Sequence, residues 1–175
     1  DWGKLAESLP QTEIAQATAI YDKLLAGAPE SVTALCNGPV EPMGTDRGQR
    51  IALQGLCLYV KTSKGEAVRA KVAGAIAKAL DAQPNKDLKC FLLRRLREVG
   101  ADSEVSALAK YTQDPTTTDA ACRALVSIGT PKAIAALRNA FSTKLKLAVR
   151  MSSAQAIGDV RDVKGAKMLM GHLGK

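Results

Sequence analysis

The sequence predicts an all-α protein, built as an α-solenoid in which antiparallel helix pairs stack in a superhelical array. Apolar residues recur at helical spacing through almost the whole chain, and no segment alternates like a strand. Aromatic residues make up only 3%, so the apolar content is mostly Ala, Leu, Val and Ile, as is typical of closely packed helices. A motif closed by glycine also recurs at a fixed spacing. The 175 residues are enough for about five helix pairs.

The first half of the chain predicts irregular helical hairpins. Gly27 ends one helix and Pro29 begins the next, where its missing N–H costs nothing. The stretch from Asn37 to Asp46 is too rich in Gly and Pro for a helix or strand, so it either bridges two hairpins or forms a binding loop at the edge of the array. Helices are expected near residues 12–26, 30–37, 47–61, 66–81 and 87–99.

The second half contains an internal repeat marked by Gly100, Gly129 and Gly158. Their spacing is constant, since 129 − 100 = 29 and 158 − 129 = 29. A fixed period in this range is the signature of stacked helical hairpins. Each glycine follows a β-branched residue, and we expect each to end the first helix of its pair in a left-handed C-cap.

A capping residue follows each marker glycine and starts the second helix of the pair. These caps are Asp102, Thr130 before Pro131, and Asp162. Glycines at 165 and 171 weaken the last copy, as expected of a terminal repeat or of an array cut inside a longer one. The chain is therefore expected to form one repeat domain over residues 1–175, irregular over 12–81 and regular, with 29-residue repeats, over 87–173.

The clearest copy of the motif runs from Ala124 to Leu137, with Leu-x-x-Ile-Gly closing the first helix and Ala-Ile-x-x-Leu in the second. It resembles the short HEAT-like repeats of bacterial proteins, closely over residues 88–173 and more loosely over 12–81. The resemblance implies an ARM-like superhelix that binds a partner along a curved surface. It also allows an accessory module of a larger protein, with a lyase-like or chaperone role.

The sequence lacks the residue patterns that catalysis would need. The related deoxyhypusine hydroxylases hold iron with His-Glu pairs, whereas the only histidine here, His172, is followed by Leu173. A hydrolytic triad needs a histidine between an acid and a nucleophile, and no phosphate-binding glycine motif follows a strand. Aromatic residues are too scattered to resemble the alkylpurine glycosylases built from such repeats. We expect no enzyme activity, no cofactor and no metal.

The charge balance favours an acidic partner. The chain has 25 Lys and Arg against 17 Asp and Glu, a net charge of +8. Positions at equal distance from the marker glycines form columns, and three of these columns hold two basic residues in three copies. We expect a scaffold for an acidic protein or peptide; a nucleic acid and a merely solvated basic face are the alternatives. The candidate residues are Arg94, Arg123, Lys132, Arg138, Arg161 and Lys167.

The four cysteines are far apart and form no C-x-x-C pair. Each lies among apolar residues, so buried free thiols are the expectation. Cys36 and Cys57, on neighbouring hairpins, are the pair considered for a disulfide. Cys90 and Cys122 are 32 residues apart, one repeat plus about one turn, which places them too far apart for a bridge.

Two features of the sequence bear on compartment and assembly. No apolar run approaches the roughly 18 residues that cross a bilayer, so no membrane association is expected. The chain opens with Asp1 and lacks an initiating Met, as in a processed exported protein or an excised domain. An exported or periplasmic location is slightly favoured over a cytoplasmic one. We expect a monomer or part of a longer chain.

Overall fold

The described part of the chain is helical throughout. The structure, a computed structural model, describes residues 1–38, 47–142 and 144–172, and these contain eleven α-helices, one short 3-10 helix and no strand. The expected all-α class is thereby confirmed. The α-helices are α1 (Trp2–Glu7), α2 (Ile14–Ala26), α3 (Glu30–Cys36), α4 (Arg47–Ser63), α5 (Glu66–Ala82), α6 (Lys86–Val99), α7 (Val105–Ala109), α8 (Thr118–Ile128), α9 (Pro131–Ala140), α10 (Leu147–Asp159) and α11 (Val163–Met170).

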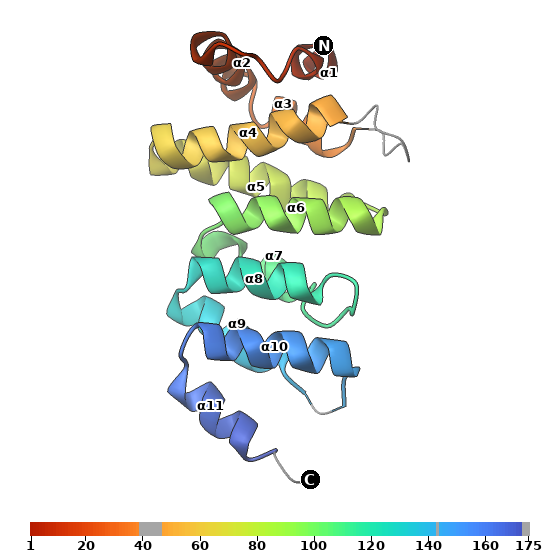
Figure 1. The fold of residues 1–175 in the computed structure, drawn as a ribbon, viewed down its shortest axis with the longest axis vertical. Helices are drawn as coiled ribbons and strands as arrows, with labels where there is room; N and C mark the ends of the chain where they lie inside the picture. The colour runs from red at the N-terminus through yellow and green to blue at the C-terminus, as the bar shows by residue number, and fades with distance from the viewer. Residues whose placement is uncertain (39–46, 143, 173–175) are drawn as a thin grey trace.

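The helices form two layers that run along the long axis of the molecule (Figure 1). One layer stacks α4, α6, α8 and α10 in order; the other contains α3, α5, α7 and α9. The chain alternates between the layers, so α4–α5, α6–α7, α8–α9 and α10–α11 are successive hairpins. At the N-terminal end α1 packs on α3 and α4, α3 packs on α5, and α2 contacts α1, α3 and α4. This arrangement is an α-solenoid, as predicted.

The core lies between the two layers and consists mainly of small and medium aliphatic side chains. On α6, Leu92, Leu93 and Leu96 are fully buried, at the spacing that places them on one side of the helix. On α8, Leu125 is fully buried as well. Burying one such leucine contributes about 1.5 to 3 kcal/mol, so burial along the stack is the main source of stability.

Polar contacts join each hairpin to the next. Lys110 Nζ donates to a carboxylate oxygen of Asp81 over 2.8 Å, and the Tyr111 hydroxyl donates to the other oxygen over 2.9 Å. Ser127 Oγ donates to the carbonyl oxygen of Arg97 over 2.8 Å. These partners are 29 or 30 residues apart in the sequence. The period seen in the sequence is therefore the period of stacking.

The three marker glycines differ in conformation, which corrects the expectation that all are left-handed caps. Gly129 ends α8 with φ 64° and ψ 7°, as predicted. Gly100 ends α6 in an extended conformation, with φ −63° and ψ 152°. Gly158 lies inside α10, which continues to Asp159. The left-handed residue there is Arg161, with φ 52°.

The expected helix ranges agree with the observed ones to within about two residues at each end across α2 to α6. Two elements differ. The short helix α1 was not predicted, and the segment after Gly100 starts with a 3-10 turn at Asp102–Glu104 before the five-residue α7. Residues 39–46 of the expected Gly- and Pro-rich loop lie outside the described residues.

Candidate interaction surface

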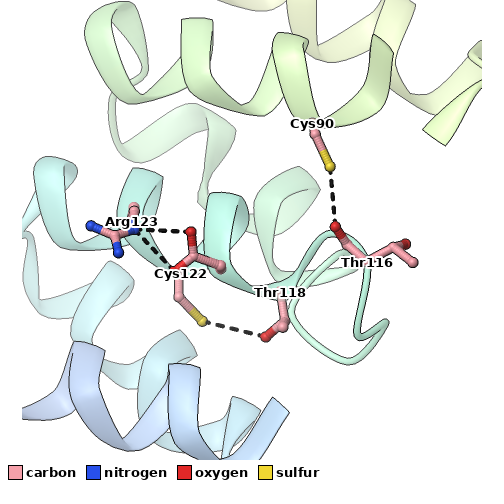
Figure 2. Close-up of polar contacts among 6 residues, drawn as sticks. Cys90, Thr116, Thr118, Cys122 and Arg123 are labelled. Carbon is pink, nitrogen blue, oxygen red and sulfur yellow. Dashed lines mark hydrogen bonds and ion pairs between the residues drawn. The ribbon is translucent and has the colours of Figure 1, made fainter. Parts of the chain in front are cut away.

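Two of the predicted basic residues lie on neighbouring helices of the same layer. Arg94 on α6 and Arg123 on α8 are both exposed. Arg123 Nε donates to both carboxylate oxygens of Asp119, over 3.0 and 2.9 Å, one turn back on the same helix (Figure 2). Such an exposed pair contributes only about 0.3 to 0.5 kcal/mol, so it leaves the guanidinium accessible. No acid among the described residues forms an ion pair with Arg94.

Two other candidates, on α9, are already engaged in contacts between hairpins. Lys132 Nζ donates to the carbonyl oxygen of Asp102 over 3.0 Å. Arg138 Nε lies 2.9 Å from Asp162 Oδ2, close enough for an ion pair but without the alignment of a hydrogen bond. The same Asp162 oxygen accepts the N–H of Gly165 over 2.9 Å and so caps α11. Lys132 and Arg138 therefore hold neighbouring hairpins together.

The last two candidates lie in the final hairpin. Arg161 is exposed between α10 and α11, and Lys167 is exposed on α11. The six candidates therefore do not form one surface, because the Arg94 and Arg123 helices belong to one layer and those of Lys132 and Arg138 to the other. Of the three predicted columns, as far as the structure describes them, only that of Arg94 and Arg123 presents two exposed arginines one repeat apart.

Two further exposed cations on helices of this layer were missed by the sequence reasoning. Lys61 on α4 and Arg97 on α6 are exposed. Burial raises the pKa of Glu98 on α6, and the nearby cations Arg95, Lys61 and Arg97 partly oppose this shift. We call Lys61, Arg94, Arg97 and Arg123 the basic row.

The missed members left different signals in the sequence. Arg97 lies three residues after Arg94, on the same side of the helix, so helical spacing could have identified it. The positions equivalent to Arg97 in the next two repeats are Val126 and Gln155, so its column contains no second cation. Lys61 precedes the regular repeats, so no marker glycine relates it to the other cations.

The four cysteines are free thiols. Cys36, Cys57 and Cys122 are buried as expected, and no bond joins Cys36 to Cys57, the pair considered for a disulfide. Burial raises the pKa of Cys36 to about 12 and that of Cys122 to about 11, so their reactive thiolates are suppressed. Cys90 is half-buried instead, with Sγ donating to the carbonyl oxygen of Thr116 over 3.1 Å (Figure 2).

Other kinds of site are not apparent in the described residues. No group of three or more His, Cys, Asp or Glu side chains is placed to hold a metal within residues 1–38, 47–142 and 144–172. No helix of that same part of the chain is long and apolar enough to cross a bilayer. His172 is exposed, and its ring centroid lies 5.7 Å from that of Phe141.

The stacked hairpins and their periodic contacts define a helical-repeat protein of the α-solenoid class. A family model for HEAT repeats matches residues 75–158 and 105–175, which together span 101 of the 175 residues (75 to 175). The chain therefore belongs to the HEAT-repeat family. No curated protein matches the chain. Repeats of this family commonly act as scaffolds for protein interactions.

Proposed function

We propose that this protein is a non-catalytic scaffold that binds an acidic protein or peptide on its basic row. The observation that carries the proposal is the placement of Arg94 and Arg123, exposed at equivalent positions of neighbouring helices. Lys61 and Arg97 add two exposed cations beside them. A partner with several carboxylates along an extended or helical segment matches this arrangement in charge and direction.

Arginine suits this role because its planar guanidinium binds a carboxylate through two parallel hydrogen bonds. Packed helices lie about 8 to 10 Å apart, which sets the spacing of the carboxylates that the row accepts. The row is solvent-exposed, so binding depends strongly on ionic strength, with a screening length of about 8 Å at physiological salt.

Charge reversal tests the proposal. The probe is a fluorescein-labelled peptide of about 20 residues, half of them glutamate, and binding is followed by fluorescence anisotropy at two salt concentrations. The double variant Arg94→Glu and Arg123→Glu is expected to weaken binding by about tenfold or more, since it reverses both central contacts. Far-UV circular dichroism checks that the variant keeps its helices.

The matched control is Lys71→Glu and Lys78→Glu on α5, two exposed lysines in the other layer. It changes the net charge by the same amount, so a general electrostatic attraction predicts the same loss. We expect less than about a twofold change for this control. Equal losses in the two double variants would rule out the basic row as the binding surface.

Nucleic acid is the second candidate, favoured by the net charge of +8. The 3% aromatic content argues against it for single strands, where stacking supplies much of the affinity. Labelled duplex and single-stranded DNA are titrated over a salt series alongside the glutamate peptide. Tighter binding of either DNA at physiological salt, weakened by the same arginine reversal, would replace the acidic partner with a nucleic acid.

A further inference from the structure

A hollow of about 320 Å³ lies between the end of α2 and the start of α5. One wall comes from the last residues of α2 and the turn after it. The other comes from the first turns of α5 and from Lys64, just after α4. Both walls belong to this chain, so the hollow lies at a junction between consecutive helix pairs. We call it the junction hollow.

Later junctions of this kind are closed by contacts that the turns themselves make. Asp102, in the turn after α6, accepts a hydrogen bond from the Thr130 hydroxyl, and its backbone carbonyl accepts one from Lys132 Nζ over 3.0 Å. At the first junction Lys64 Nζ instead lies 2.8 Å from an oxygen of Asp22, which is inside α2. This ion pair leaves space beside it, next to the turn after α2.

Aliphatic side chains form much of the lining of the junction hollow. Val72 and Ala28 are buried, and Leu25 and Val68 are half-buried. A methylene group that is fully buried against such walls strengthens binding by about fourfold. The volume is at the lower end of the range for small-molecule pockets, so the hollow suits a ligand of about ten non-hydrogen atoms.

Two lysines and one acid supply the charge of the junction hollow. Asp22 is already engaged, because one of its oxygens accepts the Tyr59 hydroxyl over 2.9 Å as well as pairing with Lys64. The contact with Asp22 raises the pKa of Lys64, which therefore stays protonated. Lys71 is exposed on α5, and no acid among the described residues forms an ion pair with it. The lining therefore favours an anionic ligand.

We propose that the junction hollow binds a small carboxylate with an aliphatic chain of about eight carbons. The carboxylate pairs with Lys71, and the chain packs against Leu25 and Val68. Few polar groups beside an apolar wall are typical of small-molecule sites. The site is separate from the basic row and adds a ligand-binding function to the proposed scaffold.

The probe is octanoate, titrated into ¹⁵N-labelled protein and followed by NMR. With about ten non-hydrogen atoms, it is expected to bind with a Kd on the order of 0.1 to 1 mM. The amide shifts are expected to concentrate at Leu25, Val68 and Val72. Hexanoate, with two methylenes fewer, is expected to bind about tenfold more weakly.

A charge reversal tests the carboxylate contact. Lys71→Glu is expected to weaken octanoate binding by at least about tenfold, because it replaces the unpaired cation with a charge that repels the ligand. The side chain is exposed, so the fold is retained. The matched control is Lys78→Glu, an exposed lysine of the same helix outside the hollow, expected to change the affinity by less than about twofold.

Four outcomes would overturn the proposal. One is the absence of shifts at the hollow up to about ten times the expected Kd. Another is equal weakening by Lys78→Glu, which would indicate a general charge effect. The third is equal affinity for octylammonium, which would remove the carboxylate contact. The fourth is tighter binding of an N-acetylated peptide ending in leucine, which would make the occupant the C-terminus of another protein.

The junction hollow and the basic row can fail independently. Arg94→Glu with Arg123→Glu is expected to change the affinity for octanoate by less than about twofold. Lys71→Glu is expected to leave the glutamate peptide unaffected. Loss of both probes in either variant would contradict the separation of the two sites.

Discussion

At the scale of single residues, positions that look equivalent in the sequence have different conformations. Gly129 has a positive φ, a backbone conformation that residues with a Cβ adopt only at an energetic cost. An added Cβ at Gly100 would lie 2.5 Å from the Leu96 carbonyl oxygen. At Gly158 the backbone is helical and an added Cβ would meet nothing within 4 Å. The repeat motif conserves the residue type across its three copies, but each copy uses it differently.

Alanine substitutions separate these three cases. Gly129→Ala is expected to lower the free energy of unfolding by about 1 to 2 kcal/mol because of its left-handed backbone. Gly158→Ala is expected to raise it by about 0.5 to 1 kcal/mol, since alanine is the better residue inside a helix. Gly100→Ala is expected to be destabilising because the carbonyl must shift. Urea unfolding measures all three; a common sign would contradict the assigned conformations.

The contacts of individual side chains also limited how much of the candidate surface could be predicted. The period placed Arg94 and Arg123 at equivalent positions, and both are exposed. It could not show that Lys132 and Arg138 contact neighbouring hairpins, because those partners depend on side-chain directions between hairpins. Exposure follows from helical spacing, whereas pairing follows from tertiary geometry.

At the scale of elements, the helices with strong 3.6-residue periodicity were predicted well. Long helices such as α4 and α5 have their own apolar face, so local spacing defines them. The short α1 is too brief to show a period, and its existence depends on packing against neighbours. The starts of helices were predicted correctly where a side chain caps the helix, as at Thr130 and Asp162.

The start of α11 offers an element-scale test, because Asp162 both caps this helix and pairs with Arg138 of α9. Asp162→Ala removes both contacts and is expected to cost about 1 to 2 kcal/mol of unfolding free energy. Asp162→Asn keeps a capping oxygen and is expected to cost less than about 1 kcal/mol.

The control for this pair is Asp159→Ala, an exposed acid at the end of α10, expected to change stability by less than about 0.5 kcal/mol. Equal losses for the Asn and Ala variants would show that the charge, and not the cap, holds α11 in place. Chemical denaturation resolves the difference, and hydrogen exchange in α11 locates it.

At the scale of the whole molecule, the stack converts a sequence period into a spatial one. Each hairpin contacts mainly its neighbours, so the stacked helices form two long surfaces. The residues of the basic row all belong to helices of one layer. The sequence period predicted this stack.

Distances between spin labels test the stack most directly. Labels on cysteines at Leu58→Cys, Arg123→Cys and Ser152→Cys, in a Cys90→Ser background, report on α4, α8 and α10; the three remaining thiols are buried. With helices about 8 to 10 Å apart, the 58–123 distance is expected to be about 20 Å and the 58–152 distance about 30 Å. Equal distances, or a longer 58–123 distance, would contradict the solenoid.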